Sequence, residues 1–378
     1  MKPFIIGVGK AGCKIADLFL DEHQGILLDT DKLTLNYFKT RNRLLIGEKS
    51  VDGNGTGRNP QLGREIFDGE RYRIVEFIDD VKKDFDCFFI FSSLGGGTGG
   101  GVSVLIEELK KSYTEPVYHV GILPSEEDPE KLIINFASCF KDIAREADSV
   151  LPVDNDLLKG RMGLLISLNK INTKIYNYFQ NIFEVGEYAS ALGSNVLGVQ
   201  DVINTLEGVA SVGLGVHEIN LQPFSKREID KPELIVALTA EAITNTLFTF
   251  DAKDSKKALV IVSGPKRYMN FLGSIPARLW LEKNLNCMEV RGGDIPSPKK
   301  ENFEVCIILS GIRKSERIRY LYQLGKILKN RGEYSTKMAE IYEKIKKVKE
   351  RLLTLEMDLN DISDNLKKIG EVNENKKI

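Results

Sequence analysis

Six glycines in seven positions, at Gly95–Gly101, are the residues whose types and spacing most clearly suggest chemistry. They follow an apolar, strand-like run and precede an amphipathic, helix-like stretch, Val102–Lys111. Glycine is costly to order, but a turn without Cβ atoms at a helix start lets several backbone N–H groups bind one anion. A flexible linker would carry serine and polar filler instead. We therefore predict a phosphate-binding loop.

Two further glycine loops bear on the ligand. Gly7–Gly12 matches G-x-G-x-x-G, and Asp29 and Asp31 follow at a distance suited to a ribose, which is typical of a dinucleotide site. A dinucleotide needs only one glycine loop close to its pyrophosphate, however, and not a second loop with more glycines. A third loop, Gly53–Gly63, also enters a predicted helix. Three such loops favour a nucleoside di- or triphosphate, and the absence of Gly-Lys-Ser/Thr excludes a Walker A loop.

The first half of the chain alternates strand-like and helical patterns, which predicts an α/β fold with a mostly parallel sheet. In such sheets ligands bind at the carboxyl ends of strands, where the glycine loops lie. The expected strands are Phe4–Val8, Gly25–Leu28, Cys87–Leu94 and Val117–Leu123. The expected helices are Cys13–Asp21, Arg64–Asp79, Val102–Ser112 and Asn135–Ala147.

The second half predicts a long central helix within Leu164–Tyr188, then a glycine-punctuated segment, Gly193–Gly215, taken as a domain boundary. A second α/β unit is expected beyond it. Its strands would be Ala258–Val262 and Val305–Leu309, and its helices Pro232–Thr246 and Asn270–Lys283.

The last segment carries a heptad seam from Tyr334 to Ile369. So narrow an apolar stripe favours a coiled coil or one partner helix, while an amphipathic helix packed on the body is the alternative.

The amino-acid composition limits which other classes of function the chain can have. The chain has 378 residues, 42% of them hydrophobic and 28% charged, with a formal net charge of −1. That balance gives no sign of nucleic-acid or lipid binding. We expect no membrane-inserted segment. Five scattered cysteines without a CxxC pair are typical of a reducing compartment, so we expect a cytoplasmic protein.

The three loops together resemble the tubulin/FtsZ superfamily. Gly95–Gly101 resembles its signature loop, Gly7–Lys14 its first nucleotide loop, and Gly55–Gly63 the loop that faces the γ-phosphate; Asp251–Pro265 is similar to an FtsZ C-terminal segment. The archaeal CetZ group is the branch that the sequence resembles most. The resemblance implies a Rossmann-like GTPase domain, a central helix, a second α/β domain of the chorismate-mutase type and a C-terminal helical extension. The expected divisions are 1–168, 169–215, 216–312 and 313–378.

The resemblance also implies which residues bind GTP or GDP. The α- and β-phosphates would be wrapped by the first loop and the signature loop, the ribose by Asp128, and guanine by two asparagines. The full set is Lys10, Ala11, Gly12, Cys13, Lys14, Gly55, Gly57, Asn59, Gly96, Gly97, Thr98, Gly99, Asp128, Asn155 and Asn172. Asn135 lies at a matching downstream position for the ribose, and Mg²⁺ is expected with the nucleotide.

The resemblance further implies head-to-tail polymers in which a loop of one subunit places an acid beside the next subunit's γ-phosphate. In the corresponding region, 195–204, Asp201 is the only acid, and we expect it to be catalytic with Asn195 in support. One family acid is replaced by Gly198 or Leu197. The leading hypothesis is a cytoskeletal GTPase in cell shape control or division. The alternatives are a GTP-binding scaffold with weak or no hydrolysis and, more remotely, an NAD-dependent oxidoreductase. The heptad helix is a second candidate surface for self-association or a partner.

Overall fold

A computed structural model describes residues 1–162, 168–186, 197–219, 232–265, 269, 273–297, 300–330 and 346–347. The chain divides into a compact unit, Met1–Gly325, and a second unit, Lys326–Ile378. Almost all of the expected heptad seam lies outside the described residues. In the described part of the chain, no helix combines the length and apolarity that crossing a bilayer requires.

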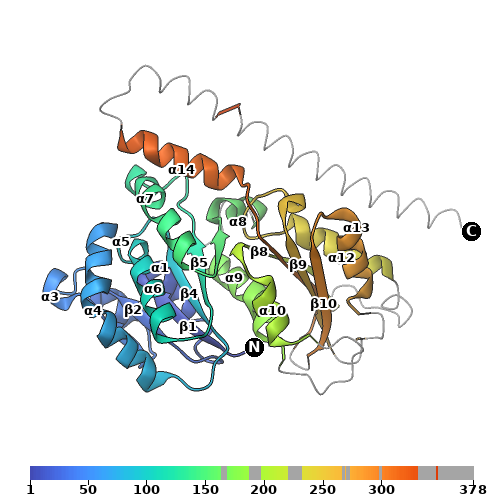
Figure 1. Ribbon diagram of the computed structural model, residues 1–378, viewed down its shortest axis with the longest axis horizontal. Helices are drawn as coiled ribbons and strands as arrows, with labels where there is room; N and C mark the ends of the chain where they lie inside the picture. The colour runs from blue at the N-terminus through green and yellow to red at the C-terminus, as the bar shows by residue number, and fades with distance from the viewer. Residues whose placement is uncertain are drawn as a thin grey trace, which may run out of the picture. The chain divides into compact units, whose positions relative to one another are not determined.

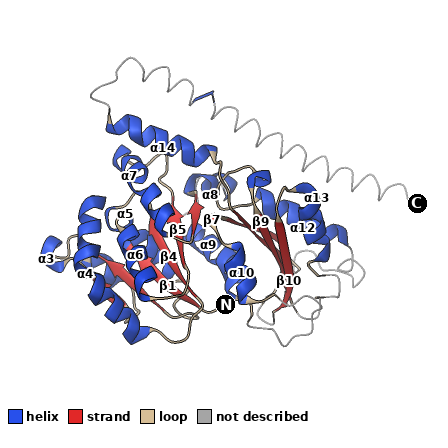
Figure 2. Ribbon diagram, viewed as in Figure 1, coloured by secondary structure: helices blue, strands red, loops and turns tan. Residues whose placement is uncertain are grey.

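The first sheet is seven-stranded, and all its neighbouring strands are parallel (Figure 2). The strand order is β3-β2-β1-β4-β5-β6-β7. Its strands are β1 (Pro3–Val8), β2 (Gly25–Asp29), β3 (Arg43–Leu45), β4 (Cys87–Ser93), β5 (Val117–Ile122), β6 (Ser149–Val153) and β7 (Gly208–Val209). Strands β1, β2, β5 and β6 are buried along their whole length, as apolar runs covered on both faces require.

Helices cover this sheet and carry the connections between its strands (Figure 1). They are α1 (Gly9–Ala16), α2 (Lys32–Tyr37), α3 (Glu48–Val51), α4 (Pro60–Val81), α5 (Gly97–Gly100), α6 (Val102–Ser112), α7 (Glu130–Glu146) and α8 (Asn155–Met162). Helices α4 and α6 pack together, as do α6 and α7, whereas α1 contacts α9 (Leu168–Phe183).

The second sheet has four strands in the order β10-β9-β11-β8. They are β8 (Ser211–His217), β9 (Lys257–Gly264), β10 (Glu289–Pro296) and β11 (Phe303–Ser310), with β11 antiparallel to both neighbours. The remaining elements are α10 (Val199–Thr205), α12 (Pro232–Thr244), the 3-10 turn η1 (Ala252–Asp254), α13 (Ile275–Asn284) and α14 (Glu316–Lys329). Helix α9 packs against α1 and also against β8, β9 and β11, so one hydrophobic core runs through both sheets.

The structure confirms most of the expected elements and changes several boundaries. The helix predicted to start at Cys13 starts at Gly9, and the helix predicted from Asn135 starts at Glu130. The final part of the glycine-punctuated segment, where a domain boundary was expected, belongs to strand β8. There Gly213 and Gly215 are required because a Cβ on either would lie 2.0 and 2.2 Å from carbonyl oxygens of α12.

Candidate nucleotide-binding site

The glycine loops lie on one edge of the first sheet because its parallel strands end together. Val8 pairs with Ser92 and with Leu28, and Ile122 pairs with Ser93 and with Val153. The segments that follow these strand ends are 9–12, 29–31, 95–101, 124–129 and 154–156. All therefore meet at the carboxyl edge, as expected for a ligand site in such a sheet.

The first loop turns directly into α1. Gly9 has a φ of +69°, which favours glycine, and a Cβ on Gly12 would lie 1.9 Å from the carbonyl oxygen of Phe91. Helix α1 can thus cross β4 closely only because position 12 has no side chain. The Lys10 side chain is exposed and Lys14 is half-buried, whereas the Cys13 thiol points into the core and donates to the Gly7 carbonyl at 3.4 Å. Cys13 can offer a nucleotide only its backbone.

The signature run forms a short helical turn rather than an open loop. Gly96 is the N-cap of α5, and α6 follows at Val102. The first N–H groups of a helix have no partner within it, and in α5 these belong to Gly97, Thr98 and Gly99. They are three of the four residues of this run in the binding set that the resemblance implied, the fourth being Gly96.

Several glycines of the run also pack against the start of α4. A Cβ on Gly97 would lie 2.0 Å from Thr56 Oγ1, and one on Gly101 would lie 2.5 Å from the carbonyl carbon of Gly63. A Cβ on Gly100 would lie 2.7 Å from Pro60 Cβ. The sequence pattern predicted anion binding alone for this run and gave no sign of this packing.

The third loop is held by left-handed backbone and by the cap of α4. Gly55 and Gly57 have φ values of +77° and +58°, and no atom lies within 4 Å of a Cβ built on Gly57. The carboxamide oxygen of Asn59 accepts from the amides of Gln61 and Leu62, so its side chain caps the helix. Asn59 therefore has a structural role that the resemblance did not imply.

Asp29, the last residue of β2, connects the turn at Thr30 to the glycine run at Thr98. Its Oδ1 accepts from the Thr30 amide at 2.7 Å and from Thr98 Oγ1 at 3.4 Å, while the Thr30 and Thr98 hydroxyls lie 2.8 Å apart. Burial, the largest cause, raises the pKa of the Asp29 carboxyl to about 6 despite these donors. Asp31, the other acid considered for a ribose, caps α2 through the amides of Leu33 and Thr34.

Asp29 and Asp31 are also the acids available to a metal ion on the phosphate side. Among the described residues, no three His, Cys, Asp or Glu side chains group to hold a metal. Mg²⁺ in nucleotide sites is commonly held by one or two carboxylates, phosphates and water. The donors present therefore fit a magnesium ion that arrives with the nucleotide.

The residues expected to contact the nucleoside lie on the β5–α7 connection, α8 and α9. Asp128 Oδ2 accepts from the Ser125 amide at 2.8 Å. Asn155 begins α8, which packs against α9, where Asn172 is half-buried. Asn135 is 2% exposed and donates to the carbonyls of Arg58 and Gly95 at 2.9 Å. Its amide nitrogen therefore ties the third loop to the glycine run 95–101.

Asp201 lies on a different edge of the molecule. Its Oδ2 accepts from the Gly198 amide at 2.9 Å and thereby caps α10, while its Oδ1 accepts from Arg291 Nη1 at 2.6 Å. Arg291 also pairs with Glu289 on β10. Asn195, its expected supporting residue, lies outside the described residues.

The position of α10 follows from its neighbours. The Met1 nitrogen donates to the carbonyl of Phe183, the last residue of α9, at 2.9 Å. A Cβ on Gly186 would lie 3.8 Å from that nitrogen and 3.3 Å from the side chain of Val199, the first residue of α10. Since β1 begins two residues after Met1, Asp201 belongs to the amino edge of the sheet (Figure 1). The phosphate loops belong to the carboxyl edge, roughly 20 Å away along a six-residue strand.

The comparisons with known proteins agree with these features. Residues 3–162 match the GTPase domain of the tubulin/FtsZ family, and residues 164–326 match the C-terminal domain of tubulin-like CetZ. The protein CetZ1 of Haloferax volcanii is 32% identical over 363 residues, which cover 86% of this chain and 92% of the relative. The chain belongs to the CetZ branch of the tubulin/FtsZ family. This membership decides against the oxidoreductase alternative.

Two solved CetZ structures resemble the fold over most of its length. A GDP-bound monomer of Haloferax volcanii CetZ1 has a TM-score of 0.75 and 31% identity, covering 87% of this chain and 100% of that one. A GTPγS-bound protofilament of Haloferax volcanii CetZ2 has a TM-score of 0.79 and 29% identity, covering 88% and 100%.

Proposed function

We propose that this CetZ-family chain binds GTP at the carboxyl edge of its first sheet and polymerises head to tail. In the filament, Asp201 of one subunit would complete the active site of the next. The family membership and the GDP-bound and protofilament forms of its relatives support this proposal. The observation that carries it is the separation of the phosphate loops from Asp201 by the length of the sheet. One chain cannot bring its own acid to its own nucleotide.

The phosphates would be bound mainly by backbone. The free N–H groups at the start of α5 and the turn into α1 would hold the α- and β-phosphates, with Lys10 and Lys14 supplying positive charge. Gly55 and Gly57 would approach the γ-phosphate. Bound Mg²⁺ would neutralise charge between the β- and γ-phosphates, and Asp29 and Asp31 would help to place it.

The nucleoside would be held by polar side chains. Asp128 would contact the ribose, and Asn155 and Asn172 would read the guanine edge, since an amide group both donates and accepts hydrogen bonds. Neither asparagine side chain is bonded to another residue in the described part of the chain, so both are available to a base.

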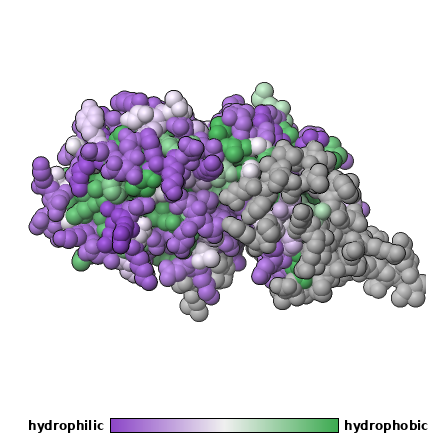
Figure 3. All heavy atoms as spheres, turned by 90° about the horizontal axis from the view of Figure 1, so that it is seen from below, coloured by the Kyte–Doolittle hydropathy of each residue, from purple (hydrophilic) through white to green (hydrophobic). Residues whose placement is uncertain are grey.

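Asp201 would orient or deprotonate the water that attacks the γ-phosphate. Its carboxylate is about one-third exposed, so an incoming subunit can reach it. Figure 3 views the molecule from below, the side near which Figure 1 draws the N-terminus, and hydrophobic patches lie among the hydrophilic residues there. A face of this mixed kind suits contact with another subunit.

The test compares Asp201→Ala with Glu289→Gln, a control that removes the other acid bound to Arg291. We expect Asp201→Ala to lower GTP turnover at least about a hundred-fold, because a positioned acid or base contributes that much. GTP affinity should be unchanged, and the control should turn over GTP like wild type. Phosphate release and equilibrium binding measure the two quantities. Unchanged turnover in Asp201→Ala would remove the assignment.

A filament protein with weak hydrolysis is the second candidate function. The specific observation is that Asp201 is the single acid in 195–204 and is already bound to Arg291. The phosphate-release rate per subunit distinguishes the two candidates. For a polymer-activated GTPase it rises with protein concentration, and for a weakly hydrolysing scaffold it stays low. We also propose that the heptad segment pairs with a second helix and that the filament serves cell shape or division, as the membership of the CetZ branch suggests.

A further inference from the structure

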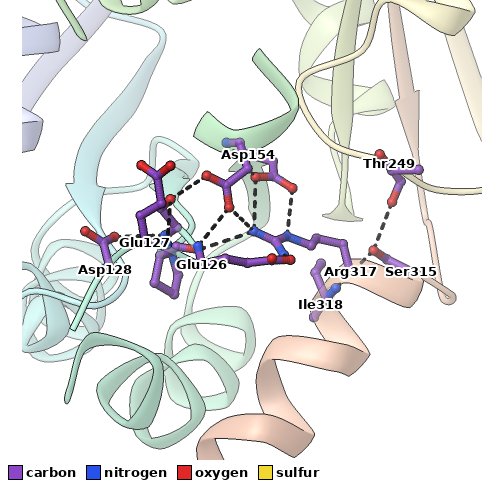
Figure 4. Close-up of polar contacts among 11 residues, drawn as sticks. Glu126, Glu127, Asp128, Asp154, Thr249, Ser315, Arg317 and Ile318 are labelled. Atoms are coloured by element: carbon purple, nitrogen blue, oxygen red, sulfur yellow. Dashed lines mark hydrogen bonds and ion pairs between the residues drawn. The ribbon is translucent and has the colours of Figure 1, made fainter. Parts of the chain in front are cut away.

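Arg317 lies among three carboxylates at the nucleoside side of the site (Figure 4). Its Nη2 is 2.7 Å from Asp156 Oδ2, its Nε is 2.8 Å from Asp154 Oδ2, and its Nη1 is 3.1 Å from Glu126 Oε1. The Arg317 side chain is only 12% exposed and that of Asp154 only 5%. Three carboxylates this close would repel one another without the guanidinium, so Arg317 determines whether they can converge.

These carboxylates in turn hold the loop that carries the proposed ribose contact. Asp156 Oδ2 accepts from the Glu126 amide at 2.9 Å, and its other oxygen accepts from the Ser125 hydroxyl. The Ser125 amide donates to Asp128. Arg317 is therefore linked to Asp128 through three successive contacts, by way of Asp156 and Ser125, and Asp156 directly follows Asn155.

The segment that carries Arg317 is also fixed to the connections of the second sheet. Ser315 Oγ donates to the Thr249 carbonyl at 3.0 Å, and the amides of Arg313 and Lys314 both donate to Asp254 Oδ2 at 2.7 Å. Thr249 and Asp254 precede β9. One short segment thus joins the nucleoside-side loop of the first sheet to the second α/β unit.

We propose that Arg317 is a positioning residue for nucleotide binding. It holds loop 124–129 and the start of α8 in the geometry that receives the nucleoside, and it couples that geometry to segment 313–317 and to the connections that precede β9. The proposal rests on the proposed function, since it concerns the same nucleotide. Coupling of this kind acts in both directions. If Arg317 raises nucleotide affinity by holding loop 124–129, then bound nucleotide also makes segment 313–317 more ordered.

The test uses Arg317→Gln, Arg317→Lys and the control Arg319→Gln. Arg319 lies on the same helix, its side chain is 61% exposed, and within the described part of the chain that side chain pairs with Glu316 alone. Affinities for GTP and for GDP are measured by calorimetry, and unfolding is followed without nucleotide. We expect Arg317→Gln to weaken GTP and GDP by the same factor, about tenfold, because the loop contacts the nucleoside that both share. Lysine should restore part of the affinity, since it keeps the charge but loses the planar fork.

A second readout separates positioning from a purely structural role. In wild type, GDP should increase hydrogen-exchange protection of the Arg313 and Lys314 amides, and in Arg317→Gln this increase should be lost. Should that variant not fold, Glu126→Gln replaces it, with an expected loss of about twofold because Glu126 is the most exposed partner of Arg317.

Each outcome separates the two proposals. If wild type binds neither GTP nor GDP, the proposed function is wrong. If wild type binds both and a folded Arg317→Gln, or Glu126→Gln in its place, binds them equally well, the role of Arg317 is wrong. A loss confined to GTP would also overturn it, because that result would place the effect at the γ-phosphate. A loss equal in Arg319→Gln would show a general effect of charge.

Discussion

The two sides of the proposed nucleotide site, the phosphate side at the glycine loops and the nucleoside side at loop 124–129, are held together in different ways. On the phosphate side, glycine backbone packs on backbone: Gly12 against Phe91, and Gly101 against Gly63. On the nucleoside side, loop 124–129 is held by Arg317 and its carboxylates. Backbone packing is insensitive to salt and pH but tolerates no added atom, whereas a cluster of charges tolerates changes of shape but depends on each charge. We therefore expect the two sides to fail under different perturbations.

The largest expected effect is that of Gly12→Ala. The new Cβ would lie 1.9 Å from the Phe91 carbonyl oxygen, so α1 or β4 must move, and we expect a loss of about 3 kcal/mol or more in unfolding free energy. Gly96→Ala is the control, because its Cβ meets no atom closer than 3.7 Å. Denaturant unfolding at low and high salt measures both. Equal stability of the two variants would show that close packing does not hold this side together.

A smaller, pH-dependent effect is expected at Asp29, the buried charge of the phosphate side. Its pKa is about 6 in the folded protein and 3.8 ordinarily, so the native carboxyl keeps its proton over an interval in which the unfolded one loses it. The contribution of Asp29 to the unfolding free energy of the wild type therefore falls by roughly 3 kcal/mol as the pH rises from about 4 to 6. The Asp29→Asn variant lacks this titration. The difference between its unfolding free energy and that of the wild type should therefore rise by roughly 3 kcal/mol between about pH 4 and 6 and stay constant above that range. Urea unfolding of the nucleotide-free proteins measures it, and a difference independent of pH would contradict the prediction.

The smallest expected effects compare one substitution at two open positions. A Cβ on Gly57 or on Gly69 meets no atom within 4 Å, but Gly57 has a φ of +58° whereas Gly69 lies inside α4. Gly57→Ala should destabilise the protein by about 1 kcal/mol through its left-handed backbone, and Gly69→Ala should stabilise it by up to about 1 kcal/mol. Thermal unfolding gives both signs. Two changes of the same sign would show that backbone conformation does not decide the outcome.

Local pattern was enough to predict much of this architecture. Helix Val102–Ser112 has its predicted bounds, and the glycine run lies between a strand and a helix as expected. The reason is that periodicity and glycine content report on the chain's immediate neighbourhood. The α4 packing of Gly97 and Gly101 was not predictable, because it joins segments about forty residues apart.

Long-range charge pairs were the other omission. Arg317 meets Asp154 across 163 positions, and no motif marks either residue. The same holds for Arg291 and Asp201, which are 90 positions apart. Asp201 was found only because the resemblance pointed to its region, and its role as the cap of α10 became visible only in the structure.

The contacts that hold the glycine turns come from the protein itself, with Gly97 on Thr56 and Asn135 bonded to both Arg58 and Gly95. These turns therefore lose their conformational entropy when the protein folds and not when a nucleotide binds. A subunit that has released its nucleotide should keep the conformation of these glycine turns. Nucleotide exchange should then depend on access to the site and not on refolding. In the proposed head-to-tail filament, only the terminal subunit would have its glycine turns uncovered, and nucleotide exchange would be confined to that end.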